Sequence, residues 1–201
     1  MTALALPTSP LPASASPRPI IFGGWLTPTG GGDEQFLARL GSRWALDVVT
    51  PNLKPEPDGR LWASVLTDAW FNGTTVLYPW PEPGLVLPPS GLPVVDGRVV
   101  NGGTTLQVTG KSGAYVPPVG KAFSVIHAGR RYLHRVKAVA LLDAVTMSLQ
   151  VAPMLRVAMA SGDVCEFDKP MIEGKVSGNA KSWTLIPARV QSLSFSIEEI
   201  A

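Results

Sequence analysis

The segment Val145-Thr146-Met147-Ser148-Leu149-Gln150-Val151 decides the fold class of this chain. Its apolar residues stand at every second position, and this period of two places one face of a β-strand on a core and the other face toward water or a partner. The same alternation returns at Leu106–Val108 and Leu193–Ile197. We therefore expect a mainly β protein.

Composition supports this fold class. The 201 residues include 20 glycines and 20 prolines, an excess that is typical of many turns between short or irregular strands. A hydrophobic content of 45% with only 16% charged residues argues against a disordered chain. A membrane helix needs about 18–20 consecutive apolar residues. The sequence contains no such run, so no membrane partner is expected.

Charge is distributed unevenly along the chain. The net charge of +2 is too small to predict binding to nucleic acid, and no sequence-specific nucleic-acid contact is expected. Residues 84–165, however, carry eight basic and three acidic side chains, so the middle of the chain is its basic part. The single cysteine, Cys165, cannot form an internal disulfide and suits folding in a reducing cytoplasm.

The first part of the chain divides into two segments. Residues 1–19 are rich in proline and small polar residues and predict an extended N-terminal arm, either a frayed terminus or a segment that becomes ordered on assembly. Residues 20–83 contain an alternating strand at Arg43–Val49 and a glycine-rich loop at 30–32. The apolar stripe at about 58–71 predicts the one helix, ending at Asn72-Gly73.

The rest of the chain predicts an inserted domain. Residues 84–165 carry turn dipeptides between short apolar runs, as in a small β-barrel or sandwich. Residues 166–201 hold strand candidates around Ile172, at Trp183–Ile186 and at Val190–Ile197, too few to enclose a core. We expect them to return to the 20–83 segment, so that both form one β domain around the insertion.

Candidate catalytic chemistry is sparse. His127 and His134 lie on the two arms of a hairpin expected around Ala128-Gly129, but two histidines without a third ligand make a weak metal site. Cys165 has no histidine nearby in sequence to activate it. The sequence therefore predicts no catalytic residue, no metal and no cofactor, and indicates that the chain is not an enzyme.

Two features suggest contacts with a partner. Trp80 stands between two prolines, in a segment with little room for a core, and is a candidate exposed anchor, although tryptophan is buried by default. Arg130, Arg131 and Arg135 form a candidate basic patch. Such charges either protect a sheet edge or contact an acidic surface of a neighbouring subunit.

A family resemblance is carried by strings spread over nearly the whole chain beyond the first 19 residues. The sequence resembles the distal tail and minor tail proteins of the tail tip, or baseplate, of long-tailed phages and prophages. The strings are FGGWLTP (22–28), LGSRWALDV (40–48), WASVLTDA (62–69), TVLYPWPEPG (75–84), GRRYLHRV (129–136), VAPMLRV (151–157), PMIEG (170–174) and SLSFSIEE (192–199).

The resemblance implies a structural protein of the virion, assembled in the host cytoplasm. Its first β domain is expected to be a tail-tube-like β-sandwich or split barrel, with the inserted β-barrel facing outward. Six copies are expected to form a ring that joins the tail tube protein to the tail hub, the tape-measure protein and the fibres. Two other classes stay open: a carbohydrate- or receptor-binding β module, marked by exposed coplanar aromatic rings, and a tail-associated hydrolase, whose catalytic constellation the sequence does not display.

Overall fold

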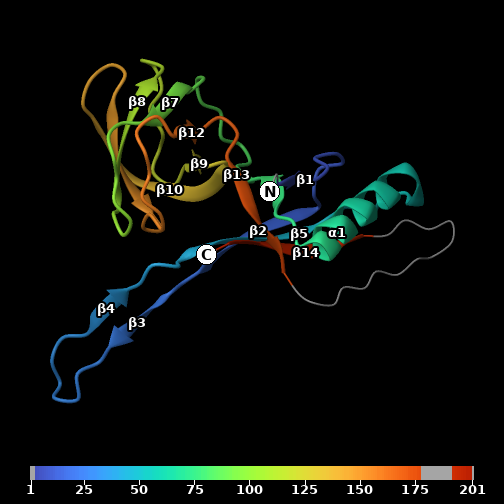
Figure 1. Ribbon diagram of the computed structural model, residues 1–201, viewed down its shortest axis with the longest axis horizontal. Coiled ribbons are helices and arrows are strands. Elements are labelled where there is room, and N and C mark those ends of the chain that lie inside the picture. The colour runs from blue at the N-terminus through green and yellow to red at the C-terminus, as the bar shows by residue number, and fades with distance from the viewer. Residues whose placement is uncertain (1–2, 178–191, 201) are drawn as a thin grey trace.

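The computed structural model describes residues 3–177 and 192–200, so the strand expected at Trp183–Ile186 lies outside the described residues. Strands dominate the described part of the chain, which confirms the mainly β prediction. They form a closed barrel, a six-stranded sheet and a separate two-stranded hairpin. Figure 1 shows the barrel and the α-helix over different parts of the sheet, with the hairpin projecting away from both.

The closed barrel is built from strands that all lie between residues 91 and 166. Its order is β10-β11-β8-β7-β12-β9, with β10 bonded to β9 to complete the circle. The strands are β7 (Gly91–Val95), β8 (Thr105–Lys111), β9 (Ala122–His127), β10 (Arg130–Leu141), β11 (Met147–Ala152) and β12 (Val164–Glu166). Met147, Leu149 and Val151 alternate into the barrel core, as their spacing predicts.

Two local features of the barrel follow from turn chemistry. Ala128 and Gly129 both have positive φ angles, 49° and 76°, and join β9 to β10 in the predicted hairpin. Val145, by contrast, is 48% exposed and precedes β11. It belongs to a turn in which Asp143 Oδ1 accepts the backbone N–H groups of Val145 and Thr146, so the alternation begins two residues later than the sequence pattern predicts.

The six-stranded sheet combines strands from both ends of the chain. Its order is β1-β6-β13-β14-β5-β2, so β14 returns to lie between β13 and β5. The strands are β1 (Leu4–Ala5), β2 (Ser14–Ile20), β5 (Arg43–Val49), β6 (Val76–Pro79), β13 (Met171–Val176) and β14 (Ser194–Glu199). Leu46 lies opposite Ile197 and Val48 opposite Phe195, and these four side chains are buried in one core cluster.

One α-helix, α1 (Arg60–Asn72), covers part of the sheet and follows a short helical turn, η1 (Pro55–Gly59). Trp62, Leu66 and Ala69 are its buried residues, and the Trp62 ring packs 5.8 Å from that of Phe195. Gly73 ends the helix in the left-handed conformation, as predicted. Leu61 belongs to the predicted stripe but is 51% exposed. Among the described residues, no helix has the length and apolar character to cross a membrane.

The N-terminal segment differs from the expected extended arm. Leu4–Ala5 pairs in parallel with β6, and Ser14–Ile20 pairs along the whole of β5, so the segment supplies both outer strands of the sheet. The prolines at 17 and 19 are compatible with this position because an edge strand tolerates residues that cannot donate a hydrogen bond. Leu6, between the two strands, is only 3% exposed and belongs to the core.

This arrangement predicts that the N-terminal segment stabilises the folded chain. Leu6→Ala removes a core side chain and should lower the free energy of unfolding by about 2–4 kcal/mol. Leu11→Ala is the matched control, because Leu11 is 79% exposed and its truncation should change stability by less than about 0.5 kcal/mol. Urea unfolding followed by tryptophan fluorescence measures both. Equal stability of the two variants would contradict a structural role for this segment.

Candidate assembly surface

The most unusual surface of the molecule is a hairpin formed by β3 (Gly23–Leu26) and β4 (Gln35–Ala38). Trp25 lies directly opposite Phe36, and their ring centroids are 5.3 Å apart. The connection at 27–34 contains three consecutive glycines, and Thr27 Oγ1 donates a hydrogen bond to Glu34 Oε1 at 3.0 Å across it. The hairpin pairs with no other strand of the described chain.

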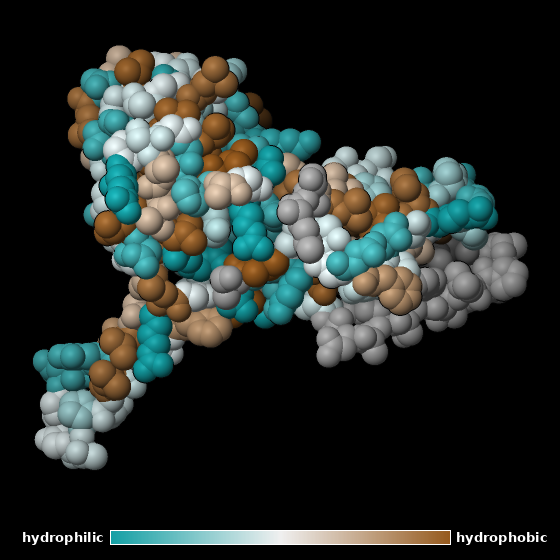
Figure 2. Space-filling model, in the orientation of Figure 1, coloured by the Kyte–Doolittle hydropathy of each residue, from teal (hydrophilic) through white to brown (hydrophobic). Residues whose placement is uncertain are grey.

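Both faces of the β3–β4 hairpin are apolar. Trp25 and Phe36 share one face and are 67% and 46% exposed. Leu26 and Leu37 alternate to the other face and are 54% and 43% exposed. Figure 2 shows hydrophobic residues along this projection and hydrophilic ones near its end. An isolated two-stranded hairpin is marginally stable in water, and exposed apolar patches mark interaction sites. This surface therefore has the properties of one that a partner covers.

The edges of the six-stranded sheet are poorly suited to bind another strand. One edge, β2, contains two prolines, and the other, β1, is only two residues long. Prolines and short strands are common protections against stray pairing at a sheet edge. Neither strand of the hairpin contains a proline, and each pairs only with the other within the described chain, which singles the hairpin out as the candidate assembly surface.

A buried ionic network joins the sheet to the barrel. The Glu199 carboxylate, 1% exposed, accepts hydrogen bonds of 2.8 Å from the backbone N–H of Trp44 in β5 and from that of Leu133 in β10. Arg156 lies 2.9 Å from the same carboxylate and also donates to the Ile200 carbonyl. Burial raises the pKa of Glu199, whereas Arg156 and the two backbone donors oppose that shift. The Glu199 carboxylate thus links β5 of the sheet to β10 of the barrel.

Other carboxylates strengthen this junction. Glu82 pairs with Lys121 and accepts the Ala122 backbone N–H at 2.8 Å. Glu173, on β13, accepts the N–H of Arg131 from β10 at 2.9 Å. Leu133 and Ala122 of the barrel belong to the same apolar cluster as the sheet. The barrel and the sheet therefore pack on each other through polar and apolar contacts together.

Trp80 is not the exposed anchor that its proline-flanked position suggests. It is 8% exposed, and its ring packs edge-on against Trp44 with centroids 5.5 Å apart. Its backbone N–H donates to the Pro170 carbonyl at 2.8 Å, which continues the pairing of β6 with β13. Few core residues lie close to Trp80 in the sequence. In the fold, residues from two distant parts of the chain surround it.

The three predicted arginines do not form a single patch. Arg131 pairs with Glu166, with Nε and Nη2 at 2.9 and 3.0 Å from the carboxylate oxygens. Arg135 is exposed, donates from Nε to the Gly120 carbonyl at 3.1 Å, and lies with its guanidinium 5.7 Å from the Trp44 ring centroid. Arg130, also exposed, is next to the β9–β10 turn. Only Arg130 and Arg135 are thus oriented for contact with another molecule.

The histidines and the cysteine occupy separate sites. His127 lies opposite Arg130, with Nδ1 2.7 Å from Asp163, whereas His134 lies opposite Phe123 and is fully buried. The strand register therefore keeps the two rings from sharing a metal. Burial raises the pKa of the Cys165 thiol to about 12, so it is protonated at neutral pH and a poor nucleophile. The described residues contain no group of three metal-ligating side chains.

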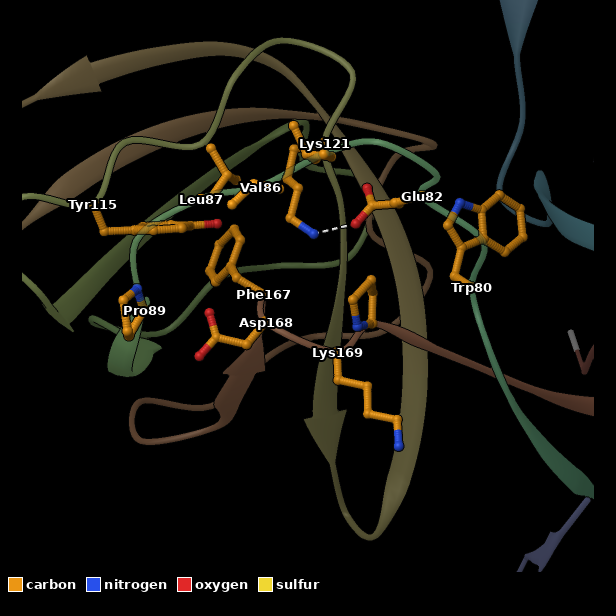
Figure 3. A pocket seen from close by; sticks show the side chains of 12 residues that line it. Trp80, Glu82, Val86, Leu87, Pro89, Tyr115, Lys121, Phe167, Asp168 and Lys169 are labelled. Atoms are coloured by element: carbon orange, nitrogen blue, oxygen red, sulfur yellow. Dashed lines mark hydrogen bonds and ion pairs between the residues drawn. The ribbon is translucent and has the colours of Figure 1, made fainter. Parts of the chain in front are cut away.

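A pocket that sequence reasoning missed lies where the linker after β6 passes the barrel (Figure 3). Its volume is about 480 Å³, and the phenol of Tyr115 points into it beside Phe167. Tyr115 and Phe167 are fully buried, and Glu82 uses both carboxylate oxygens in its bonds to Lys121 and Ala122. Asp168 and Lys169 also line the pocket, and Asp168 Oδ1 accepts the Ser90 backbone N–H at 2.9 Å. Its residues come from three distant segments, so no local pattern marks it.

Comparison with known proteins adds no assignment. No protein-family model matches the chain, and a search of curated proteins finds no relative.

The network predicts a large stability effect at Glu199. Glu199→Gln leaves Arg156 buried opposite a neutral side chain. It also places an amide group before two backbone N–H donors. We therefore expect the free energy of unfolding to fall by about 3 kcal/mol. Glu198→Gln, at the partly exposed neighbouring position, should lose less than about 1 kcal/mol. Urea denaturation at pH 7 compares them. Similar losses in both variants would argue against the network.

His134 predicts a specific acid sensitivity. Burial lowers its pKa to about 4, with a further contribution from Arg156, and Nδ1 lies 3.0 Å from the Pro153 carbonyl. Because the folded protein favours the neutral ring, its stabilising contribution is complete above pH 6.5 and is lost as pH falls toward 4. The free energy of unfolding should fall by about 3 kcal/mol over this pH range.

His134→Asn keeps a donor for the Pro153 carbonyl but removes the titration. The stability difference between wild type and this variant should therefore shrink as pH falls from 7 to 4.5. Denaturant titrations at four pH values in this range measure it, and parallel curves for the two proteins would contradict the assignment.

Proposed function

We propose that this protein is a structural subunit of the tail tip of a long-tailed phage or prophage, of the distal tail class. In this role copies form a ring, with six expected, that joins the tail tube to the hub, the tape-measure protein and the fibres. The proposal combines the sequence resemblance with one structural observation, the projecting apolar β3–β4 hairpin, which has the character of a contact between subunits.

The two-module architecture fits this role. A ring subunit needs a rigid body with protected sheet edges and an element that reaches a neighbour. The Glu199 network and the shared core make the sheet and the barrel one rigid body. The projecting hairpin is the element that extends to a neighbour. We propose that the six-stranded sheet and α1 correspond to the tail-tube-like domain and face the tube. The barrel then faces outward toward the fibres.

A purely structural role agrees with the chemistry of the described residues. The buried charged groups at the junction are engaged in ion pairs or backbone hydrogen bonds. The cysteine thiol is buried, and the two histidines are apart. We propose that the protein has no enzymatic activity, and that its place is the virion tail tip after assembly in the host cytoplasm.

The carbohydrate-binding alternative gains no support from the barrel. Its mark is two or more exposed coplanar aromatic rings. Tyr115 and Phe123 are fully buried, and Tyr132 is partly covered by Arg156, whose guanidinium lies 5.4 Å from the ring centroid. Within residues 84–165 these are the only aromatic residues, so a stacking platform for sugars is not available there.

The proposal is tested by the oligomeric state of the purified chain. Light scattering and negative-stain images should show closed rings with a central hole and a mass near six times that of one chain. Trp25→Ser combined with Phe36→Ser should shift the protein to monomers with little change in unfolding free energy, because both side chains are exposed.

Phe71→Ser is the control for that variant, since Phe71 is 86% exposed on α1 and lies outside the hairpin. It should leave the rings intact. A wild-type protein that stays monomeric at high concentration would contradict the proposed ring.

A further inference from the structure

We propose that the acidic tip of the β3–β4 hairpin in one copy binds the basic outer side of β10 in a neighbouring copy. This inference rests on the proposed ring and identifies the two surfaces that meet in it. The occupant of the β10 surface is thus a second copy of this chain, and charge complementarity is the reason for choosing it.

The tip is the acidic end of an otherwise uncharged hairpin. Asp33 and Glu34 are both exposed, and no basic residue occurs between Arg18 and Arg39. The hydrogen bond from Thr27 orients the Glu34 carboxylate at the end of β4. Two adjacent carboxylates at the end of a projection present a local negative charge, and dissolved salt screens it.

The receiving surface is formed by Arg135 and Lys137. Val136, between them, is buried in the barrel core, so both neighbours are exposed on the outer side of β10. Arg131 is also on β10, but Glu166 already neutralises it. Arg135 uses one N–H for the Gly120 carbonyl and retains further donors of its guanidinium, which suit a carboxylate.

Nearby acidic groups do not neutralise this surface. Glu82 is paired with Lys121, and Glu199 is buried beside Arg156. The 84–165 segment as a whole has eight basic and three acidic residues. Charged surfaces of opposite sign set orientation and partner choice in protein association. The hairpin tip and the β10 surface are therefore electrostatically matched.

The position of the receiving surface suits a head-to-tail contact. Arg135 lies over Trp44, and the adjacent Arg43 lies 5.0 Å from the ring of Phe22, at the base of the same chain's hairpin. The tip of one hairpin would thus meet the region beside the base of the next. At roughly 3.3 Å per residue, the nine steps from Phe22 to Gly31 span up to about 30 Å.

A head-to-tail contact uses two different surfaces on each copy, and its repetition closes into a ring when the rotation fits. The apolar faces bearing Trp25 and Leu37 would lie between neighbouring copies in that arrangement. The electrostatic contact fixes the register, and the apolar contact supplies most of the affinity.

Charge reversal tests this contact. Asp33→Lys with Glu34→Lys should raise the concentration at which half of the chains are assembled by at least tenfold, and Arg135→Glu with Lys137→Glu should do the same. Combining all four substitutions in one chain should restore assembly. Because Arg135 also contacts Trp44, Lys137→Glu alone provides a milder version of the second variant. Analytical ultracentrifugation at low and high salt measures all of them.

Matched controls are Asp68→Lys on α1 and Lys54→Glu before η1, both at exposed positions away from the two surfaces. They should assemble like wild type. Normal assembly of the tip variant, or its failure to be rescued by the reversed β10 surface, would overturn this contact. If the charge variants fail in this way but Trp25→Ser with Phe36→Ser still converts rings to monomers, the proposed function stands. Absence of wild-type assembly would contradict both.

Discussion

The relative orientation of the two modules depends on one buried carboxylate. Glu199 accepts backbone N–H groups from β5 and β10 and faces Arg156, which follows β11. A buried charge is costly unless it is paired and hydrogen-bonded, so each of these partners must stay in place. Because the partners belong to both modules, any displacement of the barrel over the sheet would leave the charge uncompensated. The hairpin and the β10 surface therefore project from one rigid frame.

The residues that stabilise the fold differ from those of the candidate assembly surface. The core of the sheet, the core of the barrel and the ionic junction are closed within the chain. The apolar side chains of the β3–β4 hairpin are left exposed, although they resemble core residues in type. Substitutions of these exposed side chains should therefore leave the folded core intact, so the proposed assembly can be tested separately from stability.

Local patterns were sufficient for much of the fold. The alternation at 145–151, the stripe of α1 and the Ala128-Gly129 turn all predict elements that the structure contains, because each depends on neighbours in sequence. Trp80 was a candidate exposed anchor because its neighbours in the fold, Trp44 and Pro170 just before β13, are distant in sequence. The strand pairing of the proline-rich segment and the Glu199 network likewise join residues more than 20 positions apart. The exposed faces of β3–β4 contain too few alternating residues to mark a strand.

The order of strands has a consequence for synthesis on the ribosome. Every barrel strand precedes β13 in the chain, so the barrel can close while later residues are still being added. The sheet cannot do so, because β14 follows β13 but lies between it and β5. Until β14 emerges, β5 and β13 present unpaired inner edges, and such edges favour aggregation of nascent chains. Translation thus delays completion of the sheet until after the barrel is available as a folded neighbour.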